Sequence, residues 1–338
     1  MSHRTVKFYQ TGTFTVGNRL LPEEDRAVQS GVGRANSLTS GHRACQGCGE
    51  ALGARCVLDA AMRAAEGNVI VANATGCLEV FSTPYPESSW RVPWIHSLFG
   101  NAPSVATGIA AALRAKGRSG VRVIAQGGDG GTTDIGMGCL SGMFERNDDV
   151  LYICYDNEAY MNTGVQRSSA TPAGARTATT PPVGEHPGHE FGRGKSVPLI
   201  AMAHSIPYVA TASVAELRDL EYKVTRAMGI CGARYIQVHV PCPLGWGSKP
   251  QDTIRIARLA IETGLFPLFE AENGKIVERH RIRSPKPVTD YLTQQKRFSH
   301  LFNESGSYAV AAIQEIADRN IRDFDLCENI CDDHSRLR

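Results

Sequence analysis

The chain has 338 residues, of which 42% are hydrophobic and 21% are charged, so it can bury a large core. Its formal net charge of +2 favours neither a nucleic-acid partner nor a membrane surface, and no apolar run reaches the roughly 18 residues of a membrane span. The first 41 residues are polar and lack the apolar core of a secretory signal. With 10 cysteines, this composition predicts metal or redox chemistry in a reducing, cytoplasmic compartment.

The first candidate site is a pair of cysteines. Cys45 and Cys48 form a CxxC motif directly before a helix that we expect from about Ala51 to Ala65. Such a pair is a redox dithiol, half of a zinc site or half of an iron–sulfur site. A thioredoxin-type dithiol follows a buried strand, and residues 38–42 do not predict one. The pair therefore needs two further ligands from elsewhere in the chain.

Two predicted strand ends offer those ligands. The apolar run that begins at Val69 ends in a glycine and then Cys77, and the strand expected over 234–240 is followed by Cys242. Cys231 precedes that strand, at the opposite edge of the sheet, so the topology favours Cys242 over Cys231. The candidate ligands are then Cys45, Cys48, Cys77 and Cys242. Their spacing does not decide between Zn²⁺ and a [4Fe–4S] cluster.

A glycine-rich turn with one aspartate forms the second candidate site. Gly128-Asp129-Gly130 follows the strand expected over 121–125, and Thr132-Thr133-Asp134 is predicted to cap a helix through Arg146. The next strand, over 150–155, ends in Asp156-Asn157-Glu158. Glycines let the backbone approach a phosphate, and Mg²⁺ prefers oxygen ligands beside a diphosphate. We therefore expect Asp129, Asn157 and the Ala159 carbonyl to hold Mg²⁺; the alternative is an ordinary turn with a chance asparagine.

The other predicted elements alternate between helix and strand. We expect helices over 102–116, 195–203 and 214–228, a strand over 208–211, and a loop over 158–197 that covers the diphosphate. Helical patterns continue over 253–263, 288–295 and 307–318. The alternation from 69 to 242 predicts an α/β fold with a doubly wound parallel sheet.

We divide the chain into three parts. Residues 1–41 form an N-terminal arm, residues 42–250 the cofactor-binding domain, and residues 251–338 a C-terminal extension that packs on partner subunits. Cys327 and Cys331 in the extension are spaced for a metal site, although a surface tail without a ligand accounts for them better.

Five motifs occur in a fixed order along the chain. They are Cys45-Gln46-Gly47-Cys48-Gly49, Ala74-Thr75-Gly76-Cys77, Gly128-Asp129-Gly130 with Asp134-Ile135-Gly136, Asn162-Thr163-Gly164 and Pro241-Cys242-Pro243-Leu244-Gly245-Trp246. As a set they resemble the β subunit of the 2-oxoacid:ferredoxin oxidoreductases, with pyruvate:ferredoxin oxidoreductase as the nearest type. The resemblance implies a sheet of the thiamine diphosphate-binding type.

The resemblance also implies three cofactors: thiamine diphosphate, Mg²⁺ and a [4Fe–4S] cluster. Mg²⁺ would be held by Asp129, Asn157 and Ala159, and the cluster by Cys45, Cys48, Cys77 and Cys242. The residues expected to contact the cofactors further include Gly47, Gly128, Gly130 and Asn162. Asn162 would lie near the reactive thiazolium carbon and bond the substrate adduct.

The implied reaction is the oxidative decarboxylation of a 2-oxoacid with coenzyme A, with electrons passed through the cluster to ferredoxin or to an NAD-reducing subunit. An α subunit would supply the carboxylate that activates the aminopyrimidine, and ferredoxin-like γ subunits would complete the complex, so we expect the isolated chain to be inactive. Pyruvate is the first choice of substrate; aryl (phenylglyoxylate-type), branched and indolyl 2-oxoacids are alternatives. Two other hypotheses are a non-redox thiamine enzyme with structural zinc and a non-enzymatic iron–sulfur carrier.

Overall fold

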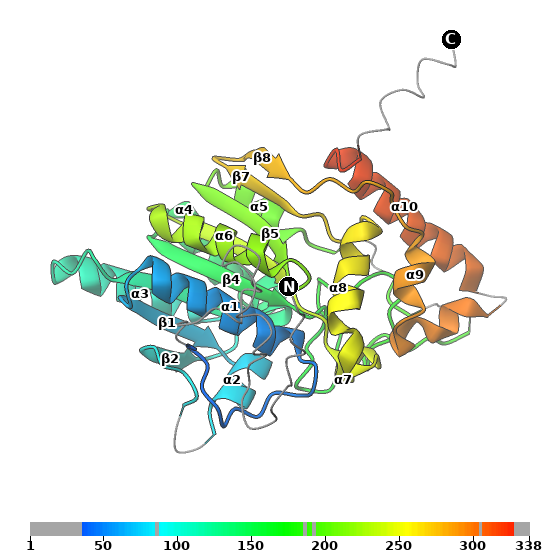
Figure 1. The fold of residues 1–338 in the computed structure, drawn as a ribbon, viewed down its shortest axis with the longest axis horizontal. Helices are drawn as coiled ribbons and strands as arrows, with labels where there is room; N and C mark the ends of the chain where they lie inside the picture. The colour runs from blue at the N-terminus through cyan, green and yellow to red at the C-terminus, as the bar shows by residue number, and fades with distance from the viewer. Residues whose placement is uncertain (1–35, 85–87, 185–187, 191–193, 304–305, 328–338) are drawn as a thin grey trace, which may run out of the picture.

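A single mixed sheet forms the centre of the part of the chain that the structure describes. The structure is a computed structural model, and it describes residues 36–84, 88–184, 188–190, 194–303 and 306–327. Along the chain the strands are β1 (Val69–Ala74), β2 (Trp94–Ser97), β3 (Arg122–Gly128), β4 (Val150–Asp156), β5 (Tyr208–Ser213), β6 (Arg234–His239), β7 (Phe269–Glu272) and β8 (Lys275–Arg279). In space the 8 strands lie in the order β2-β1-β3-β4-β6-β5-β7-β8 (Figure 1). Strands β1 to β6 are parallel, and β7 and β8 are antiparallel. The predicted α/β fold with a doubly wound parallel sheet is confirmed, with β7 and β8 as an antiparallel addition at one edge.

The central strands are buried on both faces, as their composition predicts. All 7 residues of β4 are buried. Leu151, Ile153 and Tyr155 face one hydrophobic core, and Tyr152 and Cys154 face the other. Successive side chains of a strand point to opposite faces, so a continuous apolar run fits only a strand covered on both sides.

Helices supply the two covering layers. The first core contains residues of α1 (Gly49–Ala64), α2 (Cys77–Ser82) and α6 (Leu217–Gly229), and Figure 1 shows α1 and α6 side by side over the sheet. The second contains residues of α3 (Ala102–Ala115), α4 (Met137–Glu145) and α5 (Val197–Ala203). In α1, Ala54, Val57, Leu58 and Ala61 are fully buried, and their spacing is that of one helical face.

The C-terminal segment completes this chain's own sheet and adds a third core. It contains α7 (Pro243–Trp246), η5 (Pro250–Asp252), α8 (Thr253–Glu262), α9 (Val288–Leu292), η6 (Lys296–Phe302) and α10 (Ser307–Asp323). Strand β7 pairs with β5, and Trp246, Tyr291 and Phe298 form the centre of the third core. Packing of residues 251–338 on partner subunits, and with it the division at residue 250, stays a prediction.

One local prediction was wrong, and three strands were not predicted. The chain is already helical at Gly130, in a π-helical turn η4 (Gly130–Ile135), so Thr132-Thr133-Asp134 does not cap the helix. Strand β2 was not predicted, because it is a partly exposed edge strand without clear alternation. The short β7–β8 hairpin was not foreseen.

Some predictions fall on residues outside the described ranges. Nearly all of the arm over 1–41 and the cysteine at 331 are among them. Over the described residues, no helix combines the length and the apolar composition that a membrane crossing demands.

Candidate functional site

The carboxyl ends of neighbouring parallel strands bring the predicted site residues to one edge of the sheet. Strand β3 lies between β1 and β4, and β6 follows β4. Asp129 follows β3, Asn157 follows β4, Cys77 lies beyond β1, and Cys242 lies beyond β6. The chain leaves β1 for β2 on one side and then crosses to β3 on the other, which is the type of switch point where open α/β sheets bind ligands.

A small cavity at this edge collects most of the residues predicted to bind the diphosphate and Mg²⁺. Its walls include Glu50, Cys77, Gly128, Asp129, Gly130, Asn157, Ala159, Tyr160 and Asn162. Asn162 is exposed at the rim, whereas Asp129 is fully buried. Gly47 does not line the cavity: its φ is +68°, and a Cβ there would lie 2.3 Å from the Pro250 carbonyl oxygen.

Among the residues that the structure describes, two buried oxygens in the cavity have no hydrogen-bond partner. They are Oδ1 of Asp129 and Oδ1 of Asn157. The second oxygen of Asp129 accepts a hydrogen bond from the Ser168 hydroxyl, and the Asn157 amide donates to Glu50. Because buried polar atoms are almost always paired in proteins, two orphaned acceptors on adjacent strand ends fit a cation.

The glycine-rich turn is tightly enclosed. A Cβ on Gly130 would lie 2.5 Å from the Tyr160 ring, and one on Gly131 would lie 2.8 Å from the Phe99 carbonyl oxygen. The Thr132 hydroxyl donates to the Gly128 carbonyl over 2.7 Å. Only glycine fits these positions, and π-helical turns are frequent at functional sites.

Several carboxyl groups of the site are removed from water. Burial, and then the nearby Asp156, raise the pKa of Asp129 well above its ordinary value. Burial and then Glu158 raise the pKa of Asp156 to about 7. Burial also raises the pKa of Glu50 to about 7, against hydrogen bonds from Asn157 and from the Leu78 backbone N–H. The site thus disfavours negative charge until a cation is present.

Arg297, from the C-terminal segment, stabilises the chain next to the site. Burial acts to raise the pKa of Glu158, but the charge of Arg297 and then the nearby His239, whose Nε2 lies 3.4 Å from the carboxylate, outweigh it and lower that pKa. The guanidinium carbon also lies 3.9 Å from the centre of the Trp246 ring, and the Trp246 indole N–H donates to the Asn157 carbonyl over 2.8 Å. One cation therefore supports the Glu158 carboxylate directly and the Asn157 carbonyl through Trp246.

Replacing Arg297 with methionine is expected to lower the free energy of unfolding by about 3–5 kcal/mol, because it leaves the Glu158 carboxylate buried without its cation. Denaturant unfolding of the purified chain measures the change. Arg319→Met is the matched control, since its ion pair with Glu315 is solvent-exposed, and we expect a change within about 0.5 kcal/mol. Equal changes in the two variants would contradict this assignment.

The four predicted cluster cysteines lie near one another. Burial raises the pKa of the Cys48 thiol to about 12 and that of Cys242 to about 11. For Cys77 burial is again the largest cause of a raised pKa, followed by the Glu50 carboxyl and then by Cys242, Cys48 and Cys45. Such mutual electrostatic influence requires proximity, whereas Cys231 lies before β6 at the other end of the strand.

Backbone contacts join the loops that hold these cysteines. The Gly49 N–H donates to the Pro241 carbonyl over 3.1 Å, and Ala51 and Gly245 each direct a backbone N–H at a cysteine sulfur over 3.4 Å, at Cys48 and Cys242 respectively. All cysteines among the described residues are free thiols. Within those residues no three His, Cys, Asp or Glu side chains are already arranged around a metal position, so the ligand set stays a prediction.

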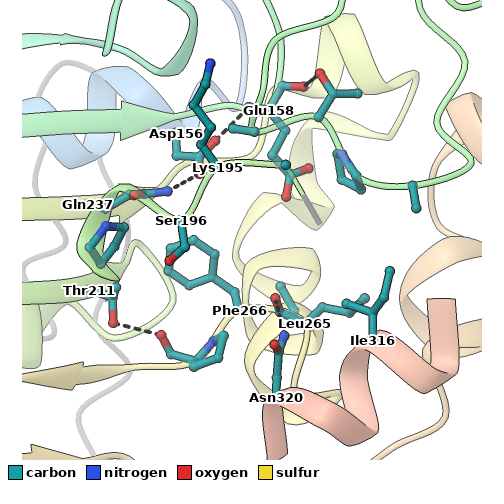
Figure 2. Close-up of a pocket in the computed structure, with 18 of the residues that line it drawn as sticks. Asp156, Glu158, Lys195, Ser196, Thr211, Gln237, Leu265, Phe266, Ile316 and Asn320 are labelled. Carbon is teal, nitrogen blue, oxygen red and sulfur yellow. Dashed lines mark hydrogen bonds between the residues drawn. The ribbon is translucent and has the colours of Figure 1, made fainter. Parts of the chain in front are cut away.

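A second, larger cavity lies beside the small one, at the ends of β4, β6 and β5. Its volume is about 400 Å³, and Figure 2 shows Asp156 and Glu158 on its polar side and Leu265, Phe266 and Ile316 on its apolar side. Its polar groups largely have hydrogen-bond partners in the protein. Examples are Gln237 to Asp156 at 2.6 Å, Thr211 to the Pro267 carbonyl at 2.7 Å and Asn320 to the Gly264 carbonyl at 2.9 Å. The smaller cavity differs from this one because it contains the buried acceptors of Asp129 and Asn157 that have no partner.

Comparison with known proteins identifies the family. Residues 74–238 match the family model described as thiamine pyrophosphate enzyme, C-terminal TPP binding domain. Pyruvate synthase subunit PorB of Methanosarcina barkeri is 52% identical over 291 residues, which cover 86% of this chain and 97% of that protein. The chain belongs to the thiamine diphosphate-binding β subunits of the 2-oxoacid oxidoreductases. Ketoisovalerate oxidoreductase subunit VorB of Pyrococcus abyssi is 46% identical over 78% of this chain and 86% of its own length.

A solved structure supports the fold of this oxidoreductase subunit. The 2-oxoglutarate:ferredoxin oxidoreductase from Magnetococcus marinus superposes with a TM-score of 0.51 and 23% identity, and the match covers 65% of this chain and 79% of that chain. The resemblance drawn from the five motifs is thereby confirmed for family and fold.

Three residues of the site were not predicted from the sequence. Glu50, Ser168 and Arg297 contact Asn157, Asp129 and Glu158. Glu50 stands two residues after Cys48, so its position in the cysteine motif was the one available signal. Nothing in the sequence near Ser168 or Arg297 indicates these contacts.

Proposed function

We propose that this subunit holds Mg²⁺ and the diphosphate of thiamine diphosphate at the small cavity, and that its complex oxidises pyruvate with coenzyme A. The observation that supports this most directly is the pair of orphaned acceptors on Asp129 and Asn157 within the matched thiamine diphosphate-binding domain. The Ala159 backbone carbonyl would complete the protein's share of the Mg²⁺ ligands.

Each residue of the site would have a role set by its position in the cavity. When bound, thiamine diphosphate supplies the electron sink for decarboxylation. Asp129 and Asn157 would fix the diphosphate end through Mg²⁺, and the enclosed turn at Gly130 would keep that end in place. Asn162, at the rim of the cavity, would donate a hydrogen bond to the reacting 2-oxoacid.

We further propose that Cys45, Cys48, Cys77 and Cys242 hold a [4Fe–4S] cluster, which accepts electrons singly when bound. Three of these thiols have pKa values raised chiefly by burial, so a bound metal centre would stabilise their thiolate forms. Cys77 also lines the small cavity, which would put a ligand of the cluster beside the thiamine site. The free thiols accord with a reducing, cytoplasmic setting.

A partner subunit would close the site. Two large apolar side chains near the cavity are exposed, Leu98 by 72% and Ile135 by 64%. The close approach of Gly100 to Ile135 brings their two segments together. An exposed apolar pair beside a site is typical of a protein interface. We propose that an α subunit covers it and brings the carboxylate that activates the aminopyrimidine, with ferredoxin-like γ subunits and ferredoxin, or an NAD-reducing subunit, as the route for electrons.

The substrate assignment can be tested with the native complex. The complex is purified without oxygen, and its visible spectrum is recorded before and after addition of coenzyme A with one 2-oxoacid. We expect a broad brown absorbance that bleaches with pyruvate, and less or not at all with 3-methyl-2-oxobutanoate or phenylglyoxylate. Bleaching by 3-methyl-2-oxobutanoate alone would favour an activity like that named for the VorB relative. A colourless, zinc-containing protein would contradict the redox proposal.

A further inference from the structure

Glu50 is a buried carboxyl that reaches from the cysteine loop into the cavity of the Mg²⁺ site. It lies in the first turn of α1, two residues after Cys48, and only 3% of it is exposed. It accepts a hydrogen bond from the Asn157 side-chain amide over 2.9 Å and another from the Leu78 backbone N–H at the start of α2. Its carboxyl group therefore has two protein donors.

The contact with Glu50 fixes which end of the Asn157 amide faces the cavity. A side-chain amide has an NH₂ donor at one end and an oxygen acceptor at the other, whereas an ionised carboxylate only accepts. With the NH₂ group of Asn157 directed at Glu50, its Oδ1 faces away and is the buried oxygen without a partner. The reverse orientation would set the amide oxygen against the carboxylate and direct the NH₂ group at the cation position.

A glutamine at position 50 would not replace this carboxylate. Asn157 and Leu78 both donate, and a glutamine side chain would bring an NH₂ group, a further donor, next to them. In its ionised form the carboxyl group accepts from both donors and leaves no donor of its own in the cavity. This accounts for an ionisable group in a position where burial alone is unfavourable.

We propose that Glu50 is a positioning residue that holds the Asn157 amide with its oxygen towards Mg²⁺. This inference rests on the proposed function. It also links the two predicted cofactor sites physically, because the same turn of chain carries Cys48 and the carboxylate that orients Asn157. Outer-shell contacts of this kind typically change metal affinity by about 10–100-fold.

The test is a double-mutant cycle on the assembled complex, with Mg²⁺-dependent binding of thiamine diphosphate measured by calorimetry. With Asn157 present, we expect Glu50→Ala to weaken binding by about 10–100-fold. With Asn157→Asp, both side-chain oxygens are acceptors and orientation no longer matters. In that background Glu50→Ala should leave the affinity unchanged or raise it, because it removes a facing carboxylate.

The possible outcomes of this cycle separate the role of Glu50 from the proposed function. An equal loss in both backgrounds means that Glu50 only supports the local fold, and it overturns the inference. An unchanged affinity for Glu50→Ala with Asn157 present also overturns it, provided that the wild type binds. If the wild-type complex shows no Mg²⁺-dependent binding at all, the proposed function fails rather than the role of Glu50.

Discussion

Replacing Cys242 with serine is expected to remove the [4Fe–4S] cluster from the complex, whereas replacing Cys231 with serine should leave it in place. The two residues lie near opposite ends of β6, and Cys242 is the one whose thiol influences Cys77 and Cys48. A serine hydroxyl does not replace a thiolate ligand of iron. The measurement is the iron and sulfide content of the anaerobically purified complex, with the visible spectrum.

Cys231→Ser is a well-matched control because it makes the same chemical change at the opposite end of the same strand. Cys231 is exposed, so its replacement should not disturb the core. If both variants keep the cluster, or if only Cys231→Ser loses it, Cys242 is not the fourth ligand. If the wild type contains zinc and Cys242→Ser loses it, the four cysteines are still the ligands, but the metal is zinc and not an iron–sulfur cluster.

The parts of the site that were predictable are those set by strand ends. A buried parallel strand has a continuous apolar run, and its carboxyl end is marked by the first polar or glycine residues. That rule placed Asp129, Asn157, Cys77 and Cys242 at one edge, and the structure places them there. The choice of Cys242 over Cys231 followed from the direction of one strand and needed no knowledge of contacts.

The parts that were not predictable depend on contacts between distant segments. Arg297 meets Glu158 across 139 positions of sequence, and Glu50 meets Asn157 across 107. A lone arginine or glutamate has no periodicity that indicates its partner, so only the packed fold reveals the pair. The π-helical turn at Gly130 was not predicted because Thr132-Thr133-Asp134 has the composition of a helix cap. In the structure these three residues lie inside the turn.

Asp129 shows how a binding residue can lower the stability of the empty chain. It is fully buried, its Oδ1 has no partner, and burial and Asp156 raise its pKa well above the ordinary value. When the pKa of a carboxyl group is higher in the folded chain than in the unfolded chain, the free energy of unfolding falls as the pH rises. The fall begins near the pKa of the unfolded chain and is complete above the raised pKa of the folded chain. At neutral pH and without Mg²⁺, the burial of this carboxyl group therefore lowers the free energy of unfolding.

Asp129→Asn is accordingly expected to have two opposite effects. It should weaken Mg²⁺-dependent binding of thiamine diphosphate by more than about 100-fold, since a direct ligand counts for more than the outer-shell contacts that change affinity by about 10–100-fold. It should also raise the free energy of unfolding of the metal-free chain at neutral pH, and this gain should vanish below the ordinary aspartate pKa of about 4. Calorimetry and denaturant titrations over a pH series measure the two effects.

The exposed carboxyl of Asp290 provides the control, because Asp290→Asn makes the same chemical change away from the cavity and should leave binding unchanged. Wild-type affinity in Asp129→Asn would remove Asp129 from the Mg²⁺ site. If Asp129→Asn loses binding and is also less stable at neutral pH, the hydrogen bond from Ser168 to the Asp129 carboxylate stabilises the fold by more than the burial of that carboxylate destabilises it. We expect Asp129→Asn to lose binding and to gain stability, because the Asp129 carboxylate binds the cation and does not stabilise the metal-free fold.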